Sequence, residues 1–241
     1  MRVIVKDDYQ EMSQEAARIV ARQVLLNPES VLGLPTGDTP TMMYEELVKM
    51  YKLNLLDFSR VVTFNLDEYY GLPPDHPQSY HRYMREKLFE HINATDGNVY
   101  IPDGSTKDAT AACRRYEEDL NRYGKIDLQV LGIGPNGHIG FNEPGTDWGM
   151  TVGLVRLSHT TRNRVAPRFG GIENVPVQAI TMGIRTIMRS RKILLLASGE
   201  GKALPTKRAI GGPITKEVPA SVLQLHPDVT LILDQEAASQ L

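Results

Sequence analysis

Short, nearly continuous apolar runs alternate along the chain with longer stretches in which apolar residues recur at helical spacing. This pattern predicts strands and helices in turn, as in a mostly parallel sheet. Because the runs contain few polar positions, we expect strands that are covered on both faces. The predicted strands are Arg2–Val5, Val31–Leu34, Val61–Phe64, Val99–Ile101, Leu128–Ile133, Ile193–Ala197 and Val229–Leu233. The prediction is therefore an α/β protein, a three-layer α/β/α sandwich.

Two of the intervening stretches carry clear helical faces. One face is marked by Met12, Ala16, Ile19, Val20 and Val24, and residues 109–123 form a second amphipathic run. Residues 145–176 are the least regular part of the chain and the richest in arginine. We interpret them as a mobile lid or an insertion within a single domain that spans residues 1–241.

Charge and cysteine content exclude several classes of function. The net charge of -2 comes from 27 basic and 29 acidic residues that are mixed along the chain, so no basic block suits nucleic acid or an anionic membrane. No signal-type or membrane-spanning stretch is present. Cys113 is the single cysteine, which excludes an intramolecular disulfide, and its helical apolar neighbours predict a buried thiol. We expect a cytoplasmic protein.

The first loop that carries candidate chemistry is LGLPTGDTP, which starts at Leu32 and precedes a predicted helix. A strand, a glycine turn and threonines before a helix can direct backbone N–H groups at an anion. The phosphate-binding candidates are Thr36, Gly37, Asp38 and Thr39. A plain turn capped by Thr39 is the alternative. Asp38 would repel a phosphate unless its side chain points away.

A second motif, NLDEYY from Asn65, places two adjacent acids where a strand ends. Neighbouring strand residues point to opposite sides, so at most one of Asp67 and Glu68 should face a pocket. A partly desolvated carboxylate there can act as a general base. A solvated turn is the alternative interpretation.

The third motif, GIGPNGHIGFNEP from Gly132, has three glycines before His138 and a carboxylate, Glu143, five residues later. A histidine oriented by a carboxylate is a proton-transfer device. The alternatives are a structural histidine and a metal site that also includes Asp67 and His76. No tight ligand spacing supports the metal site.

Four basic residues complete the set of candidates. Arg162, Arg164 and Arg168 lie in the lid segment, where a solvated surface charge is the alternative for each. Lys202 follows a predicted strand and a glycine-rich turn, which makes it a second candidate for anion binding at the same sheet edge.

With these motifs assembled, the chain resembles the glucosamine-6-phosphate deaminase family from about Leu32 to Pro227. The motifs LGLPTGDTP, FNLDEYYGLPPDHPQSY, GIGPNGHIGFNEPG and SVLQLHP carry the resemblance through their order and spacing. It implies a Rossmann-like fold, a small-molecule sugar phosphate as partner, and conversion of glucosamine 6-phosphate and water to fructose 6-phosphate and ammonia without a cofactor. A homo-oligomer is left open.

The resemblance also implies roles for single residues. Asp67 matches the base that moves a proton between C2 and C1, His138 matches the ring-opening group, and Glu143 matches the carboxylate that supports it. Thr36, Gly37, Asp38 and Thr39 match the phosphate loop, together with Arg168 and Lys202, although a one-residue shift occurs near Arg164. Asn136 stands where many relatives have aspartate, and its amide adds no charge to stabilise an imidazolium.

Two other functions compete with this one. A 6-phosphogluconolactonase would share the fold and the phosphate loop, but would need neither the Asn65–Tyr69 nor the Phe141–Pro144 segment in these forms. A sugar-phosphate sensor domain should carry an added helix-turn-helix. The resemblance further predicts loss of allosteric control. Gly153 and Val155 stand where allosteric members have basic residues, and the chain stops soon after the last predicted strand.

Overall fold

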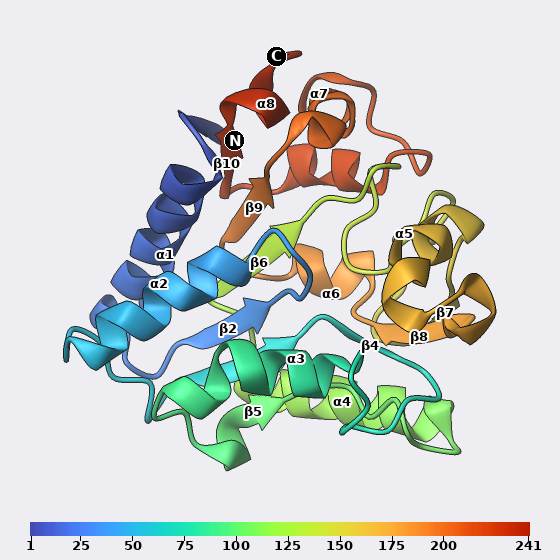
Figure 1. Ribbon diagram of the computed structural model, residues 1–241, viewed down its shortest axis with the longest axis horizontal. Coiled ribbons are helices and arrows are strands. Elements are labelled where there is room, and N and C mark those ends of the chain that lie inside the picture. The colour runs from blue at the N-terminus through green and yellow to red at the C-terminus, as the bar shows by residue number, and fades with distance from the viewer.

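The computed structural model describes residues 1–241 and contains a seven-stranded sheet whose strands are all parallel. The strand order is β1-β10-β9-β6-β2-β3-β5 (Figure 1). Its strands are β1 (Arg2–Lys6), β2 (Val31–Leu34), β3 (Val62–Asn65), β5 (Val99–Tyr100), β6 (Leu128–Gly132), β9 (Ile193–Ala197) and β10 (Val229–Asp234). All seven predicted strands are confirmed, to within one residue at each end.

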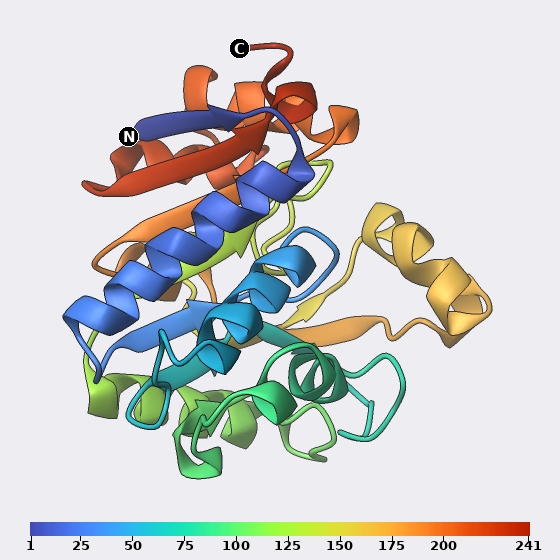
Figure 2. The same cartoon turned by 60° about the vertical axis from the view of Figure 1, so that its left-hand side comes forward.

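Helices cover both faces of this sheet (Figure 2). The helices on one face are α1 (Tyr9–Leu26), α2 (Thr41–Lys52) and α3 (Tyr80–Lys87), and those on the other are α4 (Ala109–Tyr123), α6 (Ile184–Met188), α7 (Ala203–Gly211) and α8 (Gln235–Ala238). The 3-10 turns are η1 (Phe89–His91), η2 (Asp96–Asn98), η3 (Ile172–Asn174), η4 (Glu200–Lys202) and η5 (Pro219–Leu225). The three-layer α/β/α sandwich is thereby confirmed.

Alternation along the strands explains how one sheet supports two cores. In β9, Leu194 and Leu196 join the cluster under α1 and α2, whereas Leu195 joins the cluster under α4. Successive side chains of a strand point to opposite faces, so a continuous apolar run fills both layers. The expectation of double coverage is wrong for β1, where Val3 and Val5 are 41% and 42% exposed because β1 lies at the edge of the sheet.

The two helices anticipated from periodicity form as expected. α1 begins after Asp8, whose carboxylate accepts a hydrogen bond from the Glu11 N–H at 2.8 Å, and it buries Met12 and Val20 against the sheet. An aspartate at this position satisfies an N–H group that has no partner inside the helix. α4 spans the predicted residues and carries Cys113, which is buried and unpaired.

A second, three-stranded sheet was not anticipated from the sequence. It pairs β4 (Asp67–Tyr69), β8 (Gln178–Thr181) and β7 (Gly153–Arg156) in antiparallel fashion. The 145–176 segment is consequently more regular than predicted, since it contains β7 and the helix α5 (His159–Phe169). These short strands lack a long apolar run, and β7 is only half-buried at alternate positions. Their pairing comes from tertiary contacts.

The order in which strands are added to the large sheet changes direction between β2 and β6. From β2 the order continues to β3 and β5, whereas on the other side of β2 it runs through β6, β9 and β10. Such a switch point leaves a crevice at the carboxyl ends of the two neighbouring strands, where open α/β sheets bind ligands. No helix is long and apolar enough to span a bilayer.

Candidate active site

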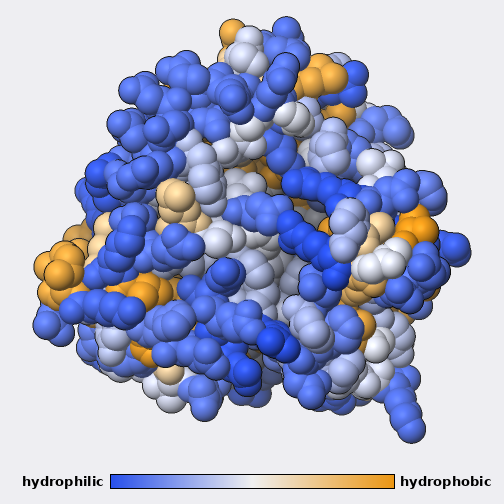
Figure 3. All heavy atoms as spheres, in the orientation of Figure 1, coloured by the Kyte–Doolittle hydropathy of each residue, from blue (hydrophilic) through white to orange (hydrophobic).

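A cavity of about 300 Å³ lies at this switch point. The loop after β2, the loop after β6, the start of β4 and residues of α3 and α5 line it. In the space-filling view the molecule is hollowed near its centre, and mainly hydrophilic side chains surround the hollow (Figure 3). The three motifs singled out in the sequence therefore meet around one cavity.

Tyrosine hydroxyls hold the carbonyl side of the β2–α2 loop. Tyr44 donates to the Pro35 carbonyl at 2.5 Å, and Tyr83 donates to the Gly37 carbonyl at 2.7 Å. Tyr9 donates to the Asp38 carbonyl at 2.8 Å. Sequence reasoning missed these tyrosines, which come from three different helices.

This arrangement leaves the amide side of the loop available. The N–H groups of Gly37, Asp38 and Thr39 donate to no other protein group, and all three residues line the cavity. The alternative of a turn capped by Thr39 is wrong, because α2 begins after Pro40 without any side-chain cap. Unpaired N–H groups before a helix are suited to bind an anion.

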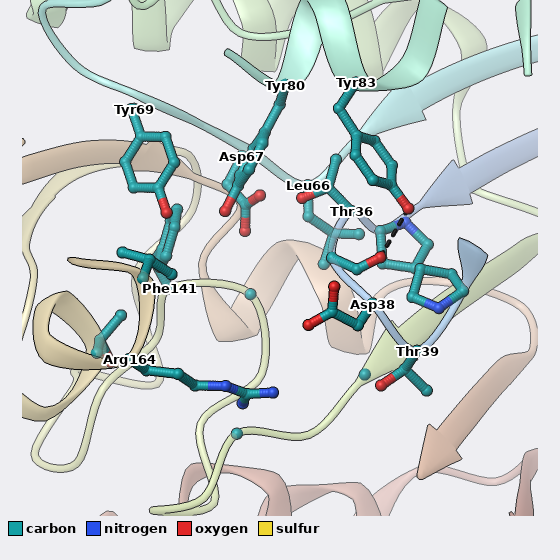
Figure 4. Close-up of a pocket in the computed structure, with 18 of the residues that line it drawn as sticks. Thr36, Asp38, Thr39, Leu66, Asp67, Tyr69, Tyr80, Tyr83, Phe141 and Arg164 are labelled. Carbon is teal, nitrogen blue, oxygen red and sulfur yellow. Dashed lines mark hydrogen bonds between the residues drawn. The ribbon is translucent and has the colours of Figure 1, made fainter. Parts of the chain in front are cut away.

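Cationic side chains face the same loop. Arg168 of α5 donates from one Nη to both carboxylate oxygens of Asp38, at 2.7 Å each. Arg164, one helical turn earlier, also lines the cavity and reaches into the open space beside Asp38 (Figure 4). Arg162 does not, since its guanidinium donates to the carbonyls of Ile172 and Val175.

Lys202, the last residue of η4 after β9, also lines the cavity. Its ammonium donates to the carbonyl of Ile133, the residue after β6, and Lys202 is buried. Burial and the nearby charge of Arg164 lower the pKa of Lys202 to about 8, although Asp38 opposes the change. An anion that bound here would favour the charged ammonium.

Asp67 is the acid that faces the cavity from β4. The strand β3 ends at Asn65, so Asp67 starts a new strand of the small sheet rather than ending β3 as predicted. Its carboxylate accepts no hydrogen bond from the protein and points into the cavity (Figure 4). Burial, and then the charge of Glu68, raise the pKa of Asp67 to about 8. Glu68 points away from the cavity, as alternation along a strand requires.

The glycine-rich loop after β6 brings His138 to the cavity. The Gly134 N–H donates to the His138 carbonyl at 2.9 Å, which closes a tight turn. A Cβ on Gly134 would lie 2.2 Å from the imidazole, so any larger residue would displace the ring. His138 Nδ1 lies 3.5 Å from Glu143 Oε2.

Glu143 is held from several sides behind His138. Oε2 accepts a hydrogen bond from the Asn136 amide at 2.7 Å, and Oε1 accepts one from the Thr161 hydroxyl at 2.5 Å. Burial opposes ionisation, but the adjacent His138 imidazole, with the hydrogen bonds from Thr161 and Asn136, lowers the pKa of Glu143 to about 2. Asn136 thus binds the carboxylate rather than the imidazole ring. Thr161 of α5, which sequence reasoning missed, links Glu143 to the 145–176 segment.

The candidate metal ligands do not converge. No three His, Cys, Asp or Glu side chains are grouped so that they could hold a metal ion. His76 stacks on Phe169 with ring centroids 6.0 Å apart, and its Nδ1 accepts from the Gln78 N–H. The cavity is instead lined by a loop with unpaired N–H groups, by cationic side chains, and by Asp67 and His138.

Comparison with known proteins identifies the family of the chain. Residues 7–232 match the family described as glucosamine-6-phosphate isomerases/6-phosphogluconolactonase. A glucosamine-6-phosphate deaminase of Halothermothrix orenii is 54% identical over 241 residues, with 100% of both chains covered. One from Thermoanaerobacter pseudethanolicus is 53% identical over 239 residues, covering 99% of this chain and 94% of the relative. The chain belongs to the glucosamine-6-phosphate deaminase family. It is an enzyme, as the sequence resemblance implied.

Solved structures lead to the same family. One described as a monomeric glucosamine-6-phosphate deaminase superposes with a TM-score of 0.98 at 46% identity, with both chains fully covered. A 6-phosphogluconolactonase of Trypanosoma cruzi superposes with a TM-score of 0.81 at 23% identity, covering 100% of this chain and 96% of that one. The second likeness shows a shared fold.

Proposed function

We propose that this enzyme converts glucosamine 6-phosphate and water to fructose 6-phosphate and ammonia. The phosphate monoester binds the N–H groups of Gly37, Asp38 and Thr39, where Lys202 and Arg168 supply positive charge. Hydrogen bonds between charged groups and phosphate are about twice as strong as neutral ones, so this end of the substrate fixes its position. The sugar ring then extends toward Asp67 and His138.

His138 opens the pyranose ring in this proposal. Ring opening moves the O1 proton to O5 while the C1–O5 bond breaks, and an imidazole can accept the first proton and deliver it to the second oxygen. Glu143, which remains ionised at neutral pH because its pKa is lowered, stabilises the imidazolium formed between these transfers. Asn136 and Thr161 keep that carboxylate in place.

Asp67 carries the isomerisation. The carboxylate removes the C2 proton of the open aldose and returns it to C1, while a proton passes from the amino group to O1. The product is a C2 imine, which water hydrolyses to the ketose and ammonia. A raised pKa makes Asp67 a stronger base once it is ionised. The positively charged amino group of the substrate favours that ionised form.

One observation carries the proposal. The Asp67 carboxylate, which is buried and has no hydrogen-bond partner, and the His138 imidazole beside Glu143 line the same cavity as the anion loop. The test is to incubate the purified enzyme with glucosamine 6-phosphate and to measure ammonia and fructose 6-phosphate together. We expect equal amounts of both products. Fructose 6-phosphate without ammonia, or neither product, would refute the proposal.

The relatives favour this reaction over the two competing functions. The deaminases are 53% and 54% identical over nearly the whole chain, whereas the lactonase is 23% identical. Hydrolysis of 6-phosphogluconolactone requires no removal of a C2 proton, so it leaves the position of Asp67 unexplained. A sensor domain requires neither Asp67 nor the supported His138. The proposed reaction belongs to the cytoplasmic degradation of amino sugars, including N-acetylglucosamine.

A further inference from the structure

Glu68 is a buried carboxylate that the proposed reaction does not use. The residue is 1% exposed, and its oxygens accept three backbone hydrogen bonds. Oε1 accepts from the Tyr69 N–H at 2.8 Å, and Oε2 accepts from the N–H groups of Tyr80 at 2.8 Å and His81 at 3.1 Å. Gly104 closes the site, since a Cβ there would lie 2.9 Å from Glu68 Cγ. The carboxylate is therefore confined as well as fully bonded.

These bonds join two elements that form the cavity wall. Glu68 lies in β4 directly after Asp67, whereas Tyr80 and His81 are the first residues of α3. Tyr80 lines the cavity, and its ring stacks on Phe141 of the loop that carries His138, with centroids 6.1 Å apart. A shift of α3 relative to β4 would move this wall with respect to Asp67.

Asp67 depends on this anchor for its direction. Its own carboxylate has no hydrogen-bond partner, so the backbone of β4 aims it at the cavity. That backbone is held on one side by pairing with β8, where Asp67 lies opposite Thr181 and Glu68 opposite Ile180. The Glu68 carboxylate also connects this strand to the first residues of α3.

We propose that Glu68 is a positioning residue for the transfer of the C2 proton: its buried carboxylate fixes the strand that bears Asp67 to the helix that forms the adjacent wall of the cavity. This inference rests on the proposed function, and in particular on Asp67 as the base. A misplacement of about 1 Å at a reacting group can cost about 10²-fold in rate. Loss of the anchor should therefore impair the Asp67 step. Ring opening should be retained, because the turn closed by the Gly134 N–H holds His138 independently of α3.

The charge of Glu68 provides a second test of the proposal, because it affects the pH at which Asp67 ionises. Burial raises the pKa of Glu68 to about 7, although the three N–H groups and Ser79 oppose this change. Burial also raises the pKa values of the surrounding phenols, so Tyr69, Tyr80 and Tyr116 stay neutral, and it lowers the pKa of His81. When Glu68 is ionised, it raises the pKa of Asp67. Removing its charge should let Asp67 ionise at lower pH.

Glu68→Gln tests both the selective loss of the Asp67 step and the change in the pH at which Asp67 ionises. Exchange of the substrate's C2 proton with solvent, followed by proton NMR, reports on Asp67. Interconversion of the two anomers of glucosamine 6-phosphate, measured by exchange NMR, requires only ring opening. We expect exchange to fall about tenfold to a hundredfold while anomer interconversion stays within about twofold. The acid limb of kcat/KM should move to lower pH, because the charge of Glu68 raises the pKa of Asp67.

Two further variants separate positioning from general destabilisation. Glu86→Gln makes the same substitution on the exposed side of α3, where Glu86 pairs with Arg82 at 2.7 Å, and should behave as wild type. Glu68→Asp keeps the charge but shortens its reach, so exchange should fall while the acid limb stays in place. It also decides the question if Glu68→Gln does not fold.

Three results would overturn the inference. Unchanged C2 exchange in Glu68→Gln would show that the anchor is dispensable. Equal losses of exchange and anomer interconversion would indicate a merely structural role. Wild-type C2 exchange in Glu68→Asp would also show that the anchor is dispensable. If instead the wild-type enzyme released no ammonia, the proposed function itself would be wrong, which is a separate outcome.

Discussion

Asp38 places a negative charge inside a loop that we propose to bind phosphate, and its removal should tighten phosphate binding. In the structure both carboxylate oxygens of Asp38 accept a hydrogen bond from the same Nη of Arg168, at 2.7 Å each. A bound phosphate has to compete for that guanidinium while lying next to Asp38. Asp38→Asn keeps the size and shape of the side chain and removes the charge.

The expected magnitude follows from the exposure of the pair. The side chains of Arg168 and Asp38 are 48% and 67% exposed, so their ion pair is worth about 0.2–1 kcal/mol. Repulsion between the carboxylate and a phosphate on the same guanidinium adds about 0.5–1 kcal/mol in water at moderate salt. The sum of about 0.7–2 kcal/mol corresponds to an increase in affinity of about threefold to thirtyfold.

The assay is the inhibition constant of inorganic phosphate against glucosamine 6-phosphate, measured at low and high ionic strength. Asp38→Asn should lower this constant, and the difference from wild type should shrink at high salt because charge repulsion is screened. Asp147→Asn is the matched control, since Asp147 forms an exposed ion pair with Lys216 at 3.5 Å and does not line the cavity. An unchanged or larger constant in Asp38→Asn would refute the reasoning. It would mean that Asp38 holds Arg168 ready for the phosphate instead of competing with it.

Other predictions test the catalytic mechanism and the absence of allosteric regulation. Asp67→Asn and His138→Ala should each lower deamination roughly 10²–10⁴-fold, but only Asp67→Asn should abolish C2 proton exchange, and only His138→Ala should be partly rescued by open-chain substrate. Near-normal turnover of cyclic substrate by His138→Ala would contradict the ring-opening role. Exhaustive chelation should leave activity intact, and activity restored by a divalent cation would revive a metal site. Substrate saturation should be hyperbolic and unaffected by N-acetylglucosamine 6-phosphate, because Gly153 and Val155 offer no cationic donor, and a sigmoidal curve that the effector makes hyperbolic would contradict this.

The sequence by itself determined the large sheet and the approximate content of the site. Strands such as Ile193–Ala197 are recognisable because burial on both faces demands an uninterrupted apolar run, and a helix such as α4 shows its period in every turn. The motifs around Gly37, Asp67 and His138 follow or adjoin such strands. Since the carboxyl ends of parallel strands meet at one edge, the local pattern was enough to anticipate a common site.

Only the tertiary structure decided how these groups are held. The small sheet formed by β4, β7 and β8 has strands too short to show a period, and β1 proved exposed because its place in the strand order is not written in its own residues. The contact between Asp38 and Arg168 joins residues 130 positions apart. Thr161 reaches Glu143 from a different element in the same way. Side-chain hydrogen bonds of this kind depend on which elements are neighbours in space, and periodicity along the chain does not carry that information.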